Sequence, residues 1–167
     1  MGSVDGEKSA CRKTLVMNFD GLCEPKNPGG VATYGVTIRG MDGEKIFEEG
    51  GLAFAEPFSD EASNNVAEYS ALIRGLKWLL DHGLNESPLV IRGDSKLVIN
   101  QLNGTFKVKA KRLVELYREA ADLLSRFKNM QIEWIERSMN TDADLLSRIA
   151  YSRFIKSAKA SRTATKN

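Results

Sequence analysis

The order of strand-like and helix-like segments constrains the fold of this chain more than any other feature of the sequence. Three segments with strand character come first, and an Asp-Gly pair typical of a tight hairpin separates the second from the third. They are TLVMNFD, VATYGVTIR and KIFEEGGLAF. Two short apolar strands, PLVIRGD and MQIEWIER, then alternate with helical patterns. A meander followed by alternating helices and strands predicts an α/β fold in which helices cover the faces of a mixed sheet.

Apolar residues that recur at helical spacing predict four helices, over residues 63–82, 95–104, 109–127 and 142–155. Gly83 and Gly104 are the stop signals of the first two. Trp78 and Trp134 lie within apolar segments, and we expect both in the core.

Length and composition indicate one domain. With 167 residues and 42% hydrophobic content, the chain can bury one full core but not two of ordinary size. We expect a disordered segment over residues 1–12, a domain over 13–157 and a disordered basic tail over 158–167. The sequence has neither a membrane-spanning apolar run nor the apolar part of a signal peptide, and Cys11 and Cys23 are interpreted as free thiols. These features predict a cytoplasmic protein with no membrane contact.

Four acidic residues lie at the edges of the predicted elements: Asp20, Glu68, Asp94 and Asp144. Carboxylates beside apolar, structure-forming residues are costly to bury unless a cation neutralises them. Asp20 and Asp94 each end a predicted strand, and ligands of open α/β sheets gather at such strand ends. The pattern predicts a divalent metal site. Taken singly, each acid could instead be a turn residue, a helix cap or a solvated helix position.

Several motifs between Thr14 and Tyr151 carry a family resemblance. DGLCEPKNPGGVATYG, SNNVAEYSALIRGL, GDSKLVINQLNG followed by FKVK, and NTDADLLSR together resemble type 1 ribonuclease H of the archaeal and bacterial variety. The resemblance implies a ribonuclease H-like fold, with a five-stranded mixed sheet of three antiparallel and then two parallel strands and helices on both faces. It also implies hydrolysis of the RNA strand of RNA/DNA hybrids, with 5′-phosphate and 3′-hydroxyl products.

The resemblance further implies a site for two Mg²⁺ or Mn²⁺ ions, which suits hard oxygen ligands and phosphodiester hydrolysis. Asp20 would bridge both ions, Glu68 and Asp94 would complete one, and Asp144 the other. Gly21 is included in this expected metal set.

The assignment of Asp144 has two competitors. Thr141 and Asp144 have the spacing of a capping box, and Asp142 could take the metal role instead. We prefer Asp144 because the family pattern Asn-x-x-Ala-Asp matches residues 140–144.

The resemblance also implies contacts with the 2′-hydroxyls and phosphates of a hybrid, without base reading. The expected contact residues are Cys23, Asn27, Ser63, Asn64, Asn65 and Lys96. Loop asparagines are ordinarily turn or cap residues, which is the simpler interpretation. Cleavage of double-stranded RNA stays open, and we expect a monomer.

Two departures from the best-known bacterial form stand out. The basic, tryptophan-rich handle between the second and third helices is absent, so we expect affinity to rest on a cluster of cations, Lys107, Lys109, Lys111 and Arg112. The loop ERSMN lacks the histidine that many members place before the last helix. His82 lies at a helix end, where interaction with the helix dipole is the expected role. The alternatives are another nuclease of the superfamily, such as an exonuclease or a reverse-transcriptase domain, and a binding module without activity.

Overall fold

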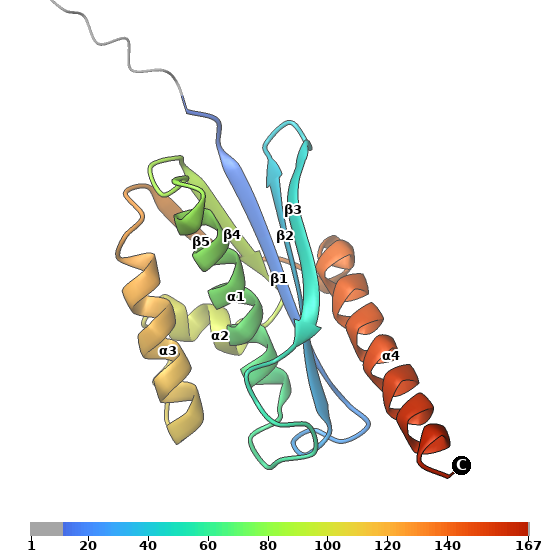
Figure 1. Ribbon diagram of the computed structural model, residues 1–167. Helices are drawn as coiled ribbons and strands as arrows, with labels where there is room; N and C mark the ends of the chain where they lie inside the picture. Colours follow the sequence, from blue (N-terminus) through green and yellow to red (C-terminus); the bar gives the residue numbers. More distant parts are fainter. Residues whose placement is uncertain (1–11, 167) are drawn as a thin grey trace, which may run out of the picture.

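The computed structural model describes residues 12–166 and is shown in Figure 1. Along the chain the elements are β1 (Leu15–Glu24), β2 (Val31–Gly40), β3 (Lys45–Leu52), α1 (Asn64–Asp81), β4 (Leu89–Gly93), α2 (Lys96–Leu102), α3 (Lys111–Leu124), β5 (Met130–Trp134), a short 3₁₀ turn (Arg137–Met139) and α4 (Thr141–Ala164). The expected disordered segment, apart from residue 12, and the expected free thiol of Cys11 lie outside the described residues.

One five-stranded sheet has the order β3-β2-β1-β4-β5. β1 pairs antiparallel with β2, and β2 pairs antiparallel with β3, through a hairpin in which Gly43 has a φ of 88°. β1 pairs parallel with β4, and β4 pairs parallel with β5. The predicted mixed sheet, with three antiparallel strands followed by two parallel strands, is therefore confirmed.

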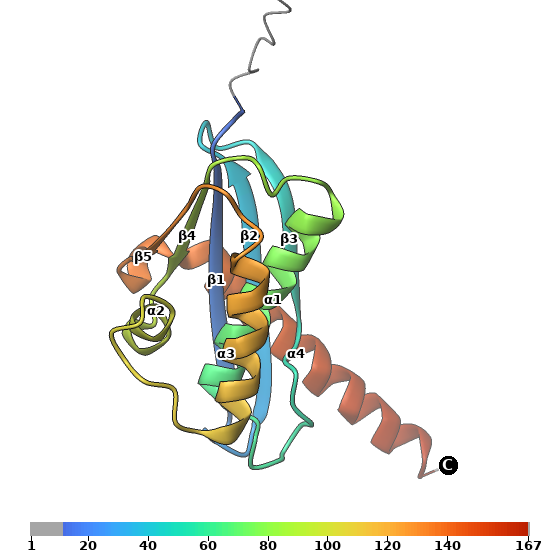
Figure 2. The ribbon, with the colours of Figure 1, turned by 90° about the vertical axis from the view of Figure 1, so that its left-hand side faces the viewer.

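Helices cover both faces of the sheet, as expected (Figures 1 and 2). α1 packs on β1 and β2, and α3 packs on α1, whereas α4 packs on β1, β2 and β3 from the other side. Met17 and Phe19 of β1, Ile38 of β2 and Leu72 and Ile91 from α1 and β4 are fully buried. This core holds the middle of β1 in a fixed position between two layers of helix.

β1 is longer than the sequence pattern suggested. The expected strand ended at Asp20 against a glycine turn, but β1 continues to Glu24 because its antiparallel ladder with β2 runs on to the pair Glu24–Val31. The parallel ladder with β4 does end here, at the pair Phe19–Gly93. Asp20 is thus the first residue of β1 beyond the edge of β4, so the expected position at a strand end holds for one neighbour only.

The last helix is also longer than expected. We placed its end at Ile155 and a disordered tail over 158–167, but α4 runs without interruption to Ala164. The expectation was wrong for residues 158–164. The segment has few apolar side chains, which suggested disorder, but it contains no proline or glycine that would end the helix. Within residues 12–166, no helix has the length and apolar character that crossing a membrane requires.

The two tryptophans differ in environment. Trp78 is half-buried and stacks on Phe47 with ring centroids 4.7 Å apart, so it borders the core. Trp134 ends the edge strand β5 and is 42% exposed. The prediction that Trp134 is a core residue was wrong, since only one neighbouring strand covers this edge of the sheet.

Candidate active site

Three carboxylates from three elements meet beside the middle of β1. Asp20 lies on β1, Glu68 lies in the first half of α1, and Asp94 directly follows β4. Each offers an oxygen such that these atoms all lie within 4.8 Å of one another. The parallel ladder brings Asp20 and Asp94 together because both follow its last pair, Phe19 and Gly93.

Gly21 allows α1 to approach β1 closely at this point. A Cβ atom at position 21 would lie 2.5 Å from the backbone nitrogen of Glu68 and 2.7 Å from the Cβ of Ala67. The Gly21 amide also donates a hydrogen bond of 2.9 Å to Oδ1 of Asp20. Gly21 is therefore a residue of close helix–strand contact, and no turn forms there.

Asp144 joins the cluster from the other face of the sheet. It lies in the first turn of α4 and lines the same pocket as Asp20, Glu68 and Asp94, a cavity of about 400 Å³. Its carboxylate accepts a hydrogen bond of 3.0 Å from Nε of Arg148, one helical turn further on. The structure thus gathers all four predicted carboxylates at one pocket.

The competing interpretations of this segment do not describe its structure. Asp142 does not line the acidic pocket, and instead its carboxylate pairs with Arg39 at 2.8 Å. Thr141 is the first residue of α4, and the capping position before it, Asn140, makes no side-chain cap hydrogen bond. No capping box forms.

Asn140 is a buried residue beside the site that our sequence reasoning used only as part of a pattern. Its side chain is 1% exposed and joins α4 to β1: it donates to the carbonyl of Phe19 at 2.9 Å and accepts from Asn18 at 3.1 Å. These bonds fix the start of α4, and with it Asp144, against the strand that carries Asp20. An asparagine before a helix suggests a cap, so the local pattern contained no signal for this role.

Burial and mutual repulsion dominate the electrostatics of the site. Burial, followed by the charge of Asp94, raises the pKa of Asp20 to about 7. Burial and the neighbouring Asp20 raise the pKa of Glu68 well above its usual range. Burial also raises the pKa of Asp94, although the Asn140 amide and the Arg137 guanidinium oppose this. The raised pKa values show that the carboxylates of the cluster lack enough neighbouring positive charge to stabilise their ionised forms.

The donor set fits a divalent cation. Glu68 is 5% exposed, and its Oε2 atom is buried with no hydrogen-bond partner among the described residues. An unpaired buried carboxylate oxygen is costly, and a bound cation removes that cost. Hard carboxylate oxygens are the ligands that Mg²⁺ and related ions prefer.

Trp134 holds the backbone that carries Asp94, and Lys96 packs on the Trp134 ring. The indole N–H of Trp134 donates to the main-chain carbonyl of Asp94 at 3.0 Å. The ammonium of Lys96 lies over the same ring, 4.8 Å from its centroid. Ser95 begins α2 as its N-cap by accepting from Val98. Lys96, predicted as a substrate contact, is exposed beside the site.

The other predicted contact residues are divided between structural roles and the pocket. The Cys23 thiol is buried and donates to the carbonyls of Lys26 and Ala62. Oδ1 of Asn27 accepts from the backbone amide of Asn64 at 3.0 Å. Cys23 and Asn64 line the acidic pocket.

Ser63 and Asn65 lie at the start of α1. Ser63 is its N-cap and accepts from Val66 at 3.2 Å, so the simpler interpretation describes its side chain. Asn65 is half-buried in the first turn.

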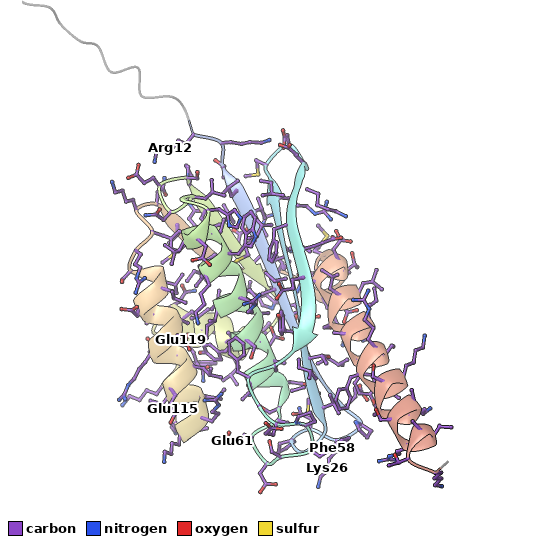
Figure 3. All side chains as sticks on the ribbon, viewed as in Figure 1. Arg12, Lys26, Phe58, Glu61, Glu115 and Glu119 are labelled. Carbon is purple, nitrogen blue, oxygen red and sulfur yellow. The ribbon has the colours of Figure 1, made fainter. Side chains whose placement is uncertain are left out.

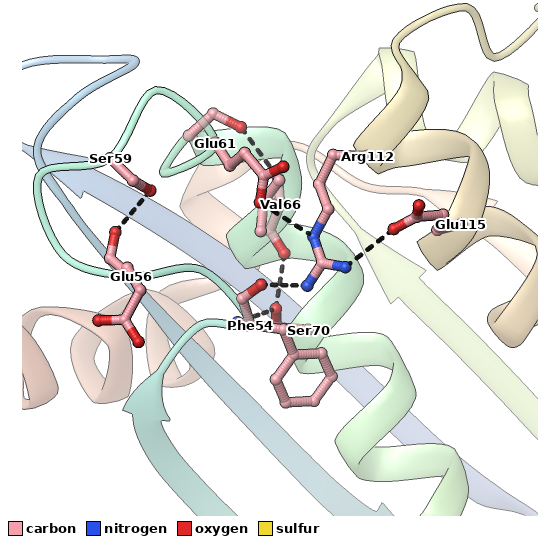
Figure 4. Close-up of polar contacts among 9 residues, drawn as sticks. Phe54, Glu56, Ser59, Glu61, Val66, Ser70, Arg112 and Glu115 are labelled. Atoms are coloured by element: carbon pink, nitrogen blue, oxygen red, sulfur yellow. Dashed lines mark hydrogen bonds and ion pairs between the residues drawn. The ribbon is translucent and has the colours of Figure 1, made fainter.

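Arg112 is not free to bind substrate as expected. Its guanidinium binds the carbonyl of Phe54 and Glu115 at 3.1 Å, with Glu61 3.8 Å away (Figure 4). It therefore joins α3 to the segment after β3. The expected contributors Lys107, Lys109 and Lys111 are exposed.

His82 caps the end of α1, far from the carboxylates along the helix. Its ring stacks on Trp78 at 3.9 Å between centroids, and its Nδ1 lies 2.8 Å from the Trp78 carbonyl. The loop before α4 places Arg137, rather than a histidine, at the pocket.

The sheet order, the helices on both faces and the four gathered carboxylates define a ribonuclease H-like domain. The chain belongs to the reverse transcriptase-like family, whose model matches residues 18–150. Bifunctional protein Rv2228c of Mycobacterium tuberculosis is 38% identical over 134 residues, which make up 80% of this chain and 35% of that protein. Ribonuclease HI of Halobacterium salinarum is 36% identical over 129 residues, or 77% of this chain and 60% of that protein.

Solved structures of ribonuclease H proteins have the same fold as this chain. The N-terminal ribonuclease H domain of Rv2228c, solved as a fusion with maltose binding protein, superposes with a TM-score of 0.76 at 33% identity, and the match covers 87% of this chain and 99% of that chain. LC11-RNase H1 in complex with an RNA/DNA hybrid gives 0.75 at 31% identity, covering 84% and 99%. The predicted resemblance to ribonuclease H is confirmed. The match spans only about a third of the length of full Rv2228c.

Proposed function

We propose that this chain is a metal-dependent endoribonuclease that hydrolyses the RNA strand of RNA/DNA hybrids and leaves 5′-phosphate and 3′-hydroxyl ends. One observation carries the proposal: Asp20, Glu68 and Asp94 converge within 4.8 Å, with a buried oxygen of Glu68 that has no partner among the described residues. Relatives support it, because one is named ribonuclease HI and another was solved with an RNA/DNA hybrid.

Asp20, Glu68 and Asp94 are the proposed ligands of one cation, and Asp20 and Asp144 those of a second, with Gly21 beside them. Two Mg²⁺ or Mn²⁺ ions would activate water and stabilise the charge that develops on the phosphate and the leaving oxygen. The chain supplies the acidic cluster, and the close contact of Gly21 with the backbone of Glu68 holds the Glu68 carboxylate near Asp20.

Two arginines at the pocket suit a phosphate. Arg137 and Arg148 line the same cavity as the carboxylates, and Arg148 already holds Asp144 by an ion pair. Their positive charge would draw the phosphate backbone toward an otherwise repulsive acidic cluster.

Selectivity for RNA would come from the rim. A hybrid exposes 2′-hydroxyls in a wide, shallow minor groove. We propose that Asn64, the backbone at Cys23 and the loop of Asn27 contact these sugars, with Ser63, Asn65 and Lys96 nearby. Such contacts carry no base sequence. A monomeric state and a cytoplasmic location stay predictions, and cleavage of double-stranded RNA stays open.

The experiment is incubation of a labelled RNA/DNA hybrid with the protein, with and without Mg²⁺, beside matched duplex DNA. We expect metal-dependent cuts within the RNA strand only, at many positions, and products that end in 3′-hydroxyls. Mononucleotide release from one end would indicate an exonuclease. Binding of the hybrid without any cut in Mg²⁺ or Mn²⁺ would indicate a binding module and refute the proposed activity.

A further inference from the structure

A line of cations on α4 starts at the acidic pocket. Asp144 and Arg148 line that pocket from the beginning of the helix, which fixes the side of α4 that faces it. At about 100° per residue, Arg162 returns to about the direction of Asp144, and Lys159 lies about 20° from the direction of Arg148. We call Arg148, Lys159 and Arg162 the α4 stripe.

Asp144 pairs with Arg148 at the start of the stripe, and no Asp or Glu follows Asp144 in the sequence. Lys159 and Arg162 are exposed, and neither is ion-paired with a carboxylate among residues 12–166. Lys159 and Arg162 therefore create a positive potential that attracts polyanions.

The second half of α4 lies beside the loop that carries Asn27. Phe154 contacts Phe58 with ring centroids 6.4 Å apart, and the Phe58 amide donates to the carbonyl of Gly30 at 2.8 Å. Figure 3 labels Phe58 and Lys26 close together at this end of the molecule. Beyond this contact α4 projects past the sheet (Figure 2). The stripe thus continues from the pocket past the proposed minor-groove contacts.

We propose that Lys159 and Arg162 bind the phosphate backbone of the hybrid on one side of the cleavage centre; this inference rests on the proposed function. Along the helix they lie about 22 and 27 Å beyond Asp144. With a phosphate about every 3.4 Å on each strand, that reach corresponds to roughly seven or eight nucleotides. The family match ends at residue 150, so this surface lies outside it. This surface on α4 is separate from the region between α2 and α3, where the basic handle is missing.

A duplex suits the stripe better than a lipid surface. Membrane-surface helices bury large apolar side chains below their cations. Among residues 12–166, no large apolar side chain beyond Leu145 is exposed, and Phe154 packs against Phe58. The cations alone remain available, which matches phosphates in water.

The chain offers a matched control. Lys159 and Arg162 form a Lys/Arg pair three residues apart, and Arg153 and Lys156 form another on the same helix. The control pair is exposed and nearer to the pocket along the axis, and each of its residues is rotated by about 120° from its counterpart six positions further on. Lys159→Gln/Arg162→Gln and Arg153→Gln/Lys156→Gln therefore remove equal charge and differ in direction.

Binding is measured by fluorescence anisotropy over a range of salt concentrations, with all variants in an Asp20→Asn background. Two hybrids are compared, of about 10 and about 20 base pairs. Their ends lie about 17 and about 34 Å from the centre of the duplex. We expect the stripe variant to weaken binding of the longer hybrid several-fold and to lower the slope of log Kd against log salt by about 2. The ratio of long- to short-hybrid affinity should fall. The control pair should leave slope and ratio at the parental values.

Equal effects of the two pairs, or no effect of the stripe pair, would overturn the inference. Circular dichroism of both variants checks that α4 is intact. Cleavage by the chain with Asp20 restored is assayed in parallel. Absence of cleavage together with the expected binding difference would refute only the proposed function, whereas cleavage with identical binding by both pairs would refute only the stripe.

Discussion

The backbone nitrogen of Glu68 lies where β1 has no side chain to obstruct it: a Cβ on Gly21 would be 2.5 Å away. This contact sets the distance between the strand that carries Asp20 and the helix that carries Glu68. Because the contact joins the backbone of Gly21 to the backbone of Glu68, neither residue can move aside without moving β1 or α1 as a whole.

Gly21→Ala should therefore separate α1 from β1. We expect a loss of about 1–3 kcal/mol in the free energy of unfolding, typical of overpacking, and weaker stabilisation by Mg²⁺. Denaturant unfolding with and without Mg²⁺ measures both. Parental stability and an unchanged response to metal would show that the contact is not restrictive.

Asp20→Asn or Asp94→Asn should abolish cleavage while hybrid binding persists. The amide keeps the shape of the side chain but removes the charge that would hold a cation. Asp142→Asn is the matched control, because Asp142 pairs with Arg39 and does not line the acidic pocket. We expect kcat to fall by at least about a thousandfold in the first two and to stay near parental in the control. Normal turnover of Asp20→Asn at saturating Mg²⁺ would refute the assignment.

The metal-free protein should become less stable as pH rises. The pKa of Asp20 is raised from 3.8 to about 7, so the folded chain holds this proton where the unfolded chain has lost it. The resulting stabilisation is fully present below about pH 4 and is lost as pH rises through about 7. Tm measured in chelator at pH 5 and pH 7.5 should fall more for the parent than for Asp20→Asn. Parallel changes in the two proteins would contradict the raised pKa.

Mg²⁺ added at pH 7.5 should raise the Tm of the parent and not that of Asp20→Asn. A cation that binds only the folded state stabilises it in proportion to the logarithm of its concentration. A titration of Tm against Mg²⁺ gives the dependence. If both proteins gained equally, the ion would be acting elsewhere.

Trp134→Phe tests the support of Asp94. Phenylalanine keeps a ring beneath Lys96 but loses the N–H that donates to the Asp94 carbonyl. One lost hydrogen bond predicts about 0.5–1.5 kcal/mol less stability. We expect kcat to fall several-fold, with a higher requirement for Mg²⁺. Phe106→Leu, at a similarly exposed aromatic residue that does not line the acidic pocket, should leave the metal requirement unchanged.

His82→Ala should retain kcat across the pH range. His82 stacks on Trp78, and about 14 residues, or about 21 Å along α1, separate it from Glu68. Proton transfer over that distance is excluded. We expect a small loss of Tm only. A large fall in kcat without a change in stability would place the active site elsewhere.

Local pattern was sufficient for the order and type of the elements. Strand alternation, helical spacing and the Asp-Gly hairpin turn predicted the five strands and four α-helices of residues 12–166, because each depends on side chains that are near one another in the chain. The acids at the edges of the predicted elements, together with the family resemblance, also predicted the four carboxylates that the structure gathers at one pocket.

Tertiary contacts decided what the pattern left open. The sequence preferred Asp144 over Asp142 only through the family pattern. Two residues on a helix that are two positions apart differ by about 200° in direction, and Asp144 lines the pocket while Asp142 pairs with Arg39. Asp20 lies within β1 rather than at its end, because β2 is longer than β4. Asn140 is a buried bridge only because β1 lies beneath it.

The sequence by itself thus determined which segments form strands and helices and which acids could meet. Only the tertiary structure decided which of those acids meet, how closely α1 approaches β1 at Gly21, and which side of α4 faces the pocket. Periodicity is set by neighbours within a few residues, whereas the direction of a side chain at a site depends on elements distant in the chain that pack against it.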